Sequence, residues 1–293
     1  MRRLFRHTRL RHLAGAIAAA AFAVSAGTTP VPASAAPAGN IVTLGDSYTA
    51  NPDQIQNTLK LRGGLSTELM DHDYPSKGGC LQAPDNWPRQ LAQKTGRDVA
   101  DWSCNAMSSG SLLGRIDQAI AAGDLHEGTA TVAVAVGAID FNGLSADGGV
   151  NALQPEKVRA NYLANIDAAN AKIKSVAPNA QVLMVGMLAA TDPAFPNNFC
   201  WLNVIPNAPI GFPVPIIQDL ENRNRANQQE AANRIGGTFV DIKSGSQAHN
   251  SCAPDAQRWV AGGVDTTTPN YHMTVHPSRA GSSFIADQVS AHL

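Results

Sequence analysis

Five short apolar segments alternate with longer stretches of helical pattern along residues 41–293. Runs rich in Val, Ile, Leu and Ala, each bounded by turn-forming residues, predict strands at 41–45, 98–102, 131–137, 181–186 and 238–242. Apolar periodicity and capping residues predict helices at 86–94, 155–176, 217–235 and 280–293. Strands separated by helices are typical of a parallel sheet covered by helices, so we predict an α/β fold with about five parallel strands.

The segment 193–215 interrupts this pattern. Six prolines lie among large apolar side chains here, and proline cannot continue a helix or a central strand. We therefore expect a long loop without regular structure. It either packs on the core as a surface loop held by a disulfide, or forms an apolar wall or lid beside a substrate cleft.

The first 35 residues have the composition of a secretory signal peptide. Residues 1–11 carry five arginines and no acid, residues 13–27 are small and apolar, and Ala33-Ser34-Ala35 offers a cleavage site. Fifteen apolar residues are fewer than the ~20 that cross a bilayer, so we expect no stable membrane anchor. We predict a secreted, extracellular protein with a single domain over residues 36–293.

Charge argues against a nucleic-acid partner. The whole chain has a formal net charge of −1, and removal of residues 1–35 leaves 17 basic and 23 acidic side chains, a net charge of −6. Binding to a phosphate backbone depends on an excess of basic side chains, which this chain lacks.

Four cysteines remain in the predicted mature chain. An even number in an exported protein favours disulfides, and the absence of a C-x-x-C spacing argues against zinc. Three pairings are possible, and we favour Cys80–Cys104 with Cys200–Cys252, because each closes a local loop. No metal or cofactor motif is apparent, so none is expected.

Ser47 follows the first predicted strand directly, in the run Gly45-Asp46-Ser47. A serine there is either a nucleophile at the carboxyl end of a strand or simply a helix cap. A nucleophilic serine needs a base, and His276 is the best candidate, since Pro277 fixes it in a loop before the last helix.

Taken in order, several segments resemble the conserved blocks of the SGNH (GDSL) hydrolases as they occur in secreted bacterial esterases and lipases. They are Gly45-Asp46-Ser47, residues 101–116, residues 136–140, residues 239–260, and His276-Pro277 followed by Gly281. The resemblance implies a three-layer α/β/α sandwich of the flavodoxin-like kind, which hydrolyses esters with Ser47 as nucleophile and His276 as base. It also implies that the main-chain N–H of Ser47 belongs to the oxyanion hole.

Two departures from the family pattern concern the oxyanion hole. Where the family reads Gly-x-Asn-Asp, this chain has Ile139 in place of the asparagine that donates to the oxyanion. Asn105 or Asn142 are candidate replacements. In the second block Ala106 occupies the position of the oxyanion glycine, while Gly110 fits that position in an alternative register.

A third departure concerns the base. The family usually has an aspartate three residues before its histidine, whereas this chain has Met273. A main-chain carbonyl orients the histidine in some secreted members, so we predict that the carbonyl of Met273 orients His276. Asp265 is a more remote alternative.

These observations predict a secreted serine esterase or lipase acting on a carboxylic ester, whose substrate is a small molecule or a lipid. We expect a monomer, with cell-envelope lipids as further candidate partners. Two alternatives stay open: transfer of the acyl group to an envelope alcohol or sugar, and a catalytically weakened SGNH fold that binds lipid or glycan.

Overall fold

The computed structural model of the chain describes residues 39–141, 153–194 and 198–293. The predicted signal peptide and Asn142 therefore lie outside the described residues.

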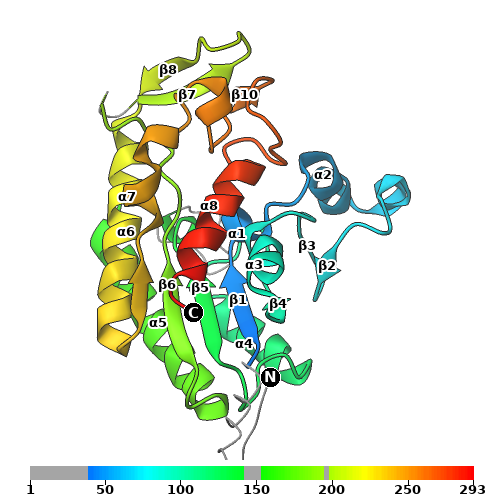
Figure 1. Cartoon of the computed structure of the whole chain (residues 1–293), viewed down its shortest axis with the longest axis vertical. Helices are drawn as coiled ribbons and strands as arrows, with labels where there is room; N and C mark the ends of the chain where they lie inside the picture. Colours follow the sequence, from blue (N-terminus) through cyan, green and yellow to red (C-terminus); the bar gives the residue numbers. More distant parts are fainter. Residues whose placement is uncertain (1–38, 142–152, 195–197) are drawn as a thin grey trace, which may run out of the picture. The chain divides into compact units, whose positions relative to one another are not determined.

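The central sheet has five parallel strands, one at each of the five predicted positions (Figure 1). They are β1 (Ile41–Gly45), β4 (Val99–Asp101), β5 (Thr131–Ala135), β6 (Gln181–Val185) and β9 (Thr238–Val240). Their spatial order is β4-β1-β5-β6-β9, so the chain passes from β1 to one edge and then returns to build the other side. The prediction of a parallel α/β sheet is confirmed.

Helices cover both faces of this sheet and form an α/β/α sandwich. Side chains of Val42, Leu44, Val134 and Met184 pack in one core with α4 (Leu112–Ala121), α5 (Pro155–Val176) and α6 (Pro215–Ile235). The intervening side chains, such as Ile41 and Leu183, pack in a second core with α3 (Trp87–Thr95) and α8 (Arg279–Ser290). Alternation along each strand thus divides the apolar residues between two layers of helices.

The four predicted helices correspond to α3, α5, α6 and α8. Four further α-helices were not predicted: α4 together with α1 (Ser47–Ala50), α2 (Gln54–Arg62) and α7 (Ile242–Ser246). Two short strands, β2 (Ser76–Lys77) and β3 (Cys80–Leu81), form a separate antiparallel hairpin.

The proline-rich segment 193–215 contains two strands of a second sheet. β7 (Asn198–Asn203) pairs antiparallel with β8 (Ile210–Pro213), and β10 (Val264–Asp265) pairs in parallel with β7. The prediction that this segment lacks regular structure is therefore wrong. Of the described prolines in this segment, Pro213 alone lies in a strand. It is the last residue of β8, an edge strand that pairs with β7 alone and needs only one set of ladder hydrogen bonds.

The structure contains the two predicted disulfides. Cys80–Cys104 ties β3 to the loop after β4, and Cys200–Cys252 ties β7 to the loop after α7. In the described part of the chain, no helix combines the length and the apolarity needed to cross a membrane.

Candidate active site

The candidate site lies at the carboxyl ends of β1, β4 and β5. Ser47 follows β1, Ala106 lies in the loop after β4, and Ile139 follows β5. Since the chain leaves β1 first toward β4 and later toward β5, the carboxyl end of β1 is the switch point of the sheet. Ligands of open α/β sheets bind at such points.

Ser47 is the first residue of α1 and is buried. Asp46 caps the helix, since its carboxylate accepts a hydrogen bond from the N–H of Tyr48 at 2.9 Å. Gly45 is required for this tight strand-to-helix turn, because a Cβ there would lie 2.1 Å from Oγ1 of Thr49. Burial raises the pKa of Asp46 to about 7, and the charge of Asp140 adds to this increase, while the hydrogen bond from Tyr48 opposes it.

His276 is oriented by a main-chain carbonyl, but the carbonyl belongs to Thr274. Nδ1 of His276 lies 2.8 Å from the oxygen of Thr274, so the prediction that Met273 supplies this oxygen is wrong. The reason is the left-handed conformation of Val275, with φ of +64°, which turns the carbonyl two residues before the histidine toward the ring. A carbonyl only accepts hydrogen bonds, so Nδ1 carries the proton and Nε2 is free to act as a base.

Two hydrogen bonds hold α1 against the His276 loop. Oη of Tyr48 donates to the oxygen of Val275 at 2.7 Å, and Nδ2 of Asn51 donates to the oxygen of Pro277 at 2.9 Å. The rings of Tyr48 and His276 also contact each other, with centroids 5.0 Å apart. The helix that begins at Ser47 and the loop that carries His276 therefore lie side by side, although they are far apart in the sequence.

Nε2 of His276 is buried and has no hydrogen-bond partner among the described residues, Ser47 included. The hydrogen bond between a catalytic serine and its base is often long or absent in an unliganded enzyme and tightens when substrate binds. Burial lowers the pKa of His276, although the hydrogen bond to Thr274 opposes this effect. The imidazole is thus neutral at neutral pH, as a general base must be.

Val275 pays a conformational cost for this arrangement. A positive φ is unusual for a β-branched residue and costs on the order of 1–3 kcal/mol. Its N–H donates to the oxygen of Gly262 at 3.1 Å, and its own oxygen accepts from Tyr48. These contacts on both sides stabilise the strained conformation next to the histidine.

The loop after β4 contains the candidate oxyanion donors. Ala106 has φ of +62°, a conformation that glycine adopts most easily, whereas the φ of Gly110 is not positive. This difference favours the register that aligns Ala106 with the oxyanion glycine of the family. Asn105 lies in the same turn and is half-buried. The disulfide from Cys104 and a 2.8 Å hydrogen bond from its N–H to Gly45 hold this turn beside the end of β1.

The loop after β5 connects to the β4 loop through Asp140. The carboxylate of Asp140 accepts hydrogen bonds from the N–H and the hydroxyl of Ser109. Ile139, which precedes Asp140, is half-buried, and its side chain has no hydrogen-bond donor.

An amide that the sequence analysis missed lies beside this loop. Asn224, on α6, packs so closely against Gly137 that a Cβ at Gly137 would lie 2.2 Å from Oδ1 of Asn224. Asn224 is buried and its Oδ1 has no partner among the described residues. Asn224 lies almost ninety residues after Gly137 in the sequence, so no local sequence pattern could have predicted this contact.

An apolar cavity of ≈ 170 Å³ is lined in part by Tyr48 and Val275, the residues next in sequence to Ser47 and His276. Its other lining side chains are mostly apolar, and many of them come from β7 and α6, among them Phe199, Trp201, Ile217 and Leu220. Such a lining suits an apolar acyl chain.

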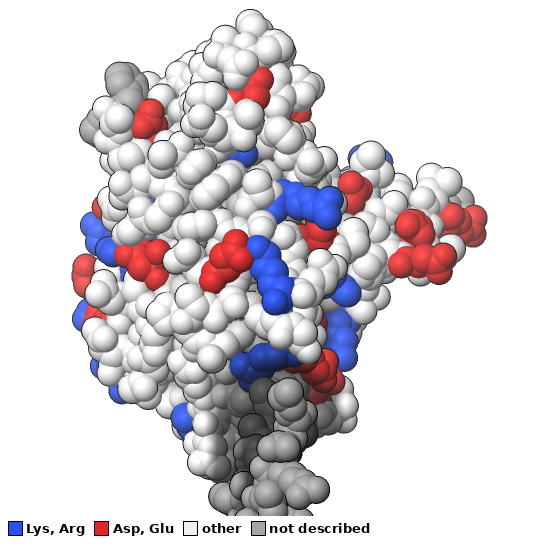
Figure 2. Space-filling model, viewed as in Figure 1, with Lys and Arg blue, Asp and Glu red and all other residues white. Residues whose placement is uncertain are grey.

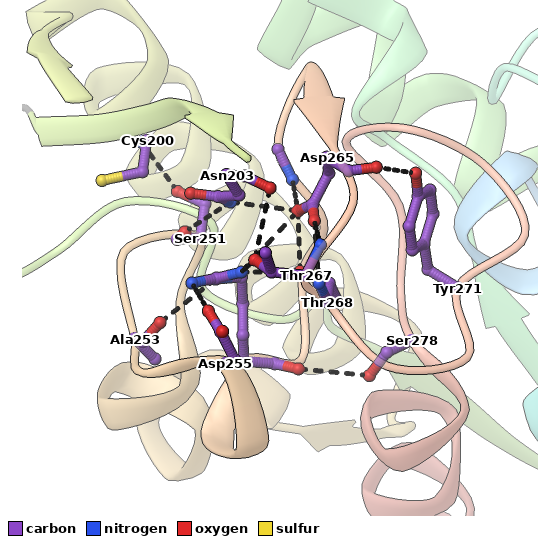
Figure 3. Close-up of polar contacts among 12 residues, drawn as sticks. Cys200, Asn203, Ser251, Ala253, Asp255, Asp265, Thr267, Thr268, Tyr271 and Ser278 are labelled. Atoms are coloured by element: carbon purple, nitrogen blue, oxygen red, sulfur yellow. Dashed lines mark hydrogen bonds and ion pairs between the residues drawn. The ribbon is translucent and has the colours of Figure 1, made fainter. Parts of the chain in front are cut away.

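Asp265, the alternative partner for His276, points into a different network (Figure 3). It accepts hydrogen bonds from the N–H of Gly262 and from Thr268 and Asn203, and it lies 3.9 Å from Arg258. Burial raises its pKa, but these hydrogen bonds outweigh burial and leave the pKa below the usual value. Asp265 therefore joins β7 to residues 262–268, and its carboxylate is engaged there and not at His276.

The described residues contain no group of three or more His, Cys, Asp or Glu side chains that could hold a metal ion. A parallel sheet covered by helices, with an apolar cavity beside the loops that carry Ser47 and His276, is typical of enzymes that hydrolyse esters. The family model for the GDSL-like lipase/acylhydrolase family matches residues 43–283, and the chain belongs to this family, the SGNH hydrolases.

Several known proteins are similar to the chain. "Lipase 2" of Streptomyces coelicolor is 25% identical over 304 residues, which cover 95% of each chain. The crystal structure of phospholipase A1 from Streptomyces albidoflavus matches 87% of this chain and 98% of its own, with a TM-score of 0.57 and 16% identity. The extracellular lipase of Streptomyces rimosus matches 87% and 99%, with a TM-score of 0.57 and 18% identity. The structural matches support the α/β fold of the family.

Proposed function

We propose that residues 36–293 form a secreted serine esterase or lipase that hydrolyses carboxylic esters through an acyl-enzyme on Ser47. The observation that carries this proposal is the pair of hydrogen bonds that joins α1 to the His276 loop, from Tyr48 to Val275 and from Asn51 to Pro277. The two disulfides and the extracellular lipase among the similar structures support secretion.

The chemistry begins when Nε2 of His276 takes the proton of the Ser47 hydroxyl as Oγ attacks the ester carbonyl. The main-chain N–H groups of Ser47 and Ala106 stabilise the oxyanion. The tetrahedral intermediate then collapses, and protonated His276 gives its proton to the departing alcohol. Water, deprotonated by His276, attacks the acyl-enzyme and releases the acid and free Ser47.

The apolar cavity next to Tyr48 and Val275 holds the acyl chain in this proposal. The alcohol part of the ester then faces the open side of the serine. An alcohol or sugar that enters from that side in place of water would accept the acyl group, which is why hydrolysis and acyl transfer share one site.

A second candidate is a weakened hydrolase fold that binds lipid or glycan. Ile139 favours it, because loss of one oxyanion donor costs ~10²–10³ in turnover. One experiment separates the candidates: hydrolysis of nitrophenyl esters of increasing chain length by residues 36–293, beside the Ser47→Ala variant. Activity that disappears in Ser47→Ala supports the enzyme, while equal rates for two folded proteins would contradict it.

A further inference from the structure

Exposed apolar side chains gather on the small sheet and its flanks. Of the twelve large hydrophobic side chains that are exposed among the described residues, seven belong to this region. They are Trp201, Val204, Ile205, Ile210, Phe212, Ile216 and Val264, and we call them the hairpin face. In Figure 1 the strands β7, β8 and β10 lie beyond the carboxyl ends of the central strands, at the end where α1 also lies.

Strand pairing arranges these side chains in rows. Leu202 on β7 pairs with Ile210 on one side and Val264 on the other, so an apolar row crosses all three strands. The register of β7 and β8 shifts between Cys200 and Leu202, and a bulge of this kind redirects the side chain within it. The redirected side chain is Trp201, which is 46% exposed.

This region also lacks charge. Residues 193–218 contain no Asp, Glu, Lys, Arg or His. The charged side chains beneath the sheet are engaged, since Arg258 and Asp265 are buried together and Asp255 pairs with Arg258 at 2.9 Å. In Figure 2 this end of the molecule is mostly white, with isolated acidic side chains and no cluster of lysine and arginine on the face in view.

The hairpin face is continuous with the acyl cavity. Trp201 belongs to both, since its exposed ring also lines the cavity, and its neighbour Phe199 lines the cavity at a centroid distance of 6.0 Å from it. The same cavity is also lined by Tyr48 and Val275, the residues next in sequence to Ser47 and His276. An acyl chain could therefore pass from the hairpin face to Ser47 along apolar side chains.

The hairpin is held rigidly in this position. Cys200–Cys252 anchors β7, and the indole of Trp201 packs against Gly263, where a Cβ would lie 2.2 Å from the ring. The Asp265 network joins Asn203 on β7 to residues 262–268 (Figure 3). The apolar face is thus a preformed surface, and exposing it to water without a partner is unfavourable.

We propose that the hairpin face docks on the surface of aggregated lipid with neutral or zwitterionic headgroups and directs acyl chains into the cavity. This inference rests on the proposed function and names the physical state of the substrate. Apolar residues with a tryptophan suit insertion at the boundary of headgroups and acyl chains. Because the face carries no lysine or arginine, docking depends on apolar burial and not on anionic lipid.

The test measures co-sedimentation of the Ser47→Ala protein with large vesicles of palmitoyl-oleoyl phosphatidylcholine, so that no hydrolysis alters the membrane. We expect binding that is not weakened when NaCl is raised from 0.1 M to 1 M, since apolar burial is not screened by salt. Adding Ile205→Asp and Phe212→Asp, both at side chains that are 53% exposed, should reduce the partition coefficient at least 10-fold.

A matched control carries Ile55→Asp and Leu61→Asp on α2, where the side chains are 67% and 77% exposed but far from β8 in the fold. This control should bind vesicles like the parent. In the active protein, both double variants should hydrolyse a soluble short-chain nitrophenyl ester at the parental rate, which tests the proposed function separately from docking.

Three outcomes would overturn the inference: no binding to vesicles, equal loss of binding in both double variants, or binding that disappears at 1 M NaCl. A concentration-dependent dimer in sedimentation velocity that only the hairpin variant abolishes, without vesicle binding, would instead assign the face to a second copy of the chain. If Ser47→Ala loses activity on the soluble ester but no vesicle binding is seen, the proposed hydrolase function is supported and the docking inference is wrong.

Discussion

Oη of Tyr48, the residue after the candidate nucleophile, donates a 2.7 Å hydrogen bond to the main-chain oxygen of Val275, the residue before the candidate base. The bond spans 227 positions of the sequence and joins the two loops that carry Ser47 and His276. It also stabilises the positive φ of Val275, which in turn directs the carbonyl of Thr274 to the imidazole. The hydroxyl of Tyr48 thus contributes to the geometry of the pair, together with the hydrogen bond from Asn51 to Pro277.

Tyr48→Phe should lower kcat by roughly 10-fold, because small displacements of a catalytic group are costly. The free energy of unfolding should fall by ~1 kcal/mol for the lost hydrogen bond. Steady-state kinetics and urea unfolding measure the two effects. Tyr74→Phe is the matched control, since Oη of Tyr74 accepts a hydrogen bond from the N–H of Asp53, outside the site. An equal loss of kcat in both variants would contradict the positioning role.

Ile139→Asn should raise turnover. The variant restores a side-chain amide at the family position of the third oxyanion donor, and such a donor is worth ~10²–10³ in kcat when well placed. We expect an increase of at least ~10-fold, since the surrounding loop has adapted to isoleucine. Ile139→Leu, which adds no donor, should leave kcat unchanged. If Ile139→Asn is no faster than Ile139→Leu, the oxyanion hole does not lack a donor at this position.

The pH dependence of kcat/KM should follow the neutral form of His276. Burial lowers the pKa of this histidine, so the free enzyme keeps its base deprotonated to a pH below 6.5. Activity on an uncharged, soluble ester should therefore fall toward acid with a midpoint below 6.5. A midpoint at or above 6.5 would contradict a buried, neutral base.

Asp46 should lower the free energy of unfolding as the pH rises, whereas most carboxylates in folded proteins raise it. Its pKa rises from 3.8 in the unfolded chain to about 7 in the fold, so the native state holds the extra proton between these values. Its contribution to the free energy of unfolding is fully present below about pH 4 and is lost as the pH rises through about 7.

Asp46→Asn removes this dependence and keeps the cap, because asparagine also accepts from the N–H of Tyr48. As the pH rises from 4 to 7, the free energy of unfolding of the parent should fall by on the order of a few kcal/mol relative to that of the variant. Above pH 7 the difference between the two proteins should stay constant. Urea unfolding at several pH values measures this difference. A difference that stays constant from pH 4 to pH 8 would show that Asp46 is ionised throughout.

Much of this architecture could be predicted from the sequence, because it depends on patterns that neighbouring residues carry. The five strands were evident as apolar runs, and the disulfides Cys80–Cys104 and Cys200–Cys252 followed from the short loops they close. The β7–β8 hairpin was missed because prolines normally exclude strands, and only the tertiary structure makes β8 an edge strand.

The details of the site that escaped prediction depend on backbone conformation and distant contacts. The carbonyl of Thr274 replaces that of Met273 because Val275 adopts a positive φ, which is exceptional for valine. Asn224 reaches Gly137 from α6, a helix that begins only after three further strands in the chain. No local pattern of residue types predicts either of these two features.

The proposed function depends on acylation of Ser47 with His276 as its base. The most direct measurement treats residues 36–293 with an alkyl fluorophosphonate, which forms a stable adduct with an activated serine, and locates the adduct by mass spectrometry of peptides. We expect one adduct, on Ser47, that is absent in Ser47→Ala and forms at least ~10²-fold more slowly in His276→Ala. A folded protein that takes no label on Ser47, or that takes it equally fast without His276, would contradict acylation of Ser47 with His276 as its base.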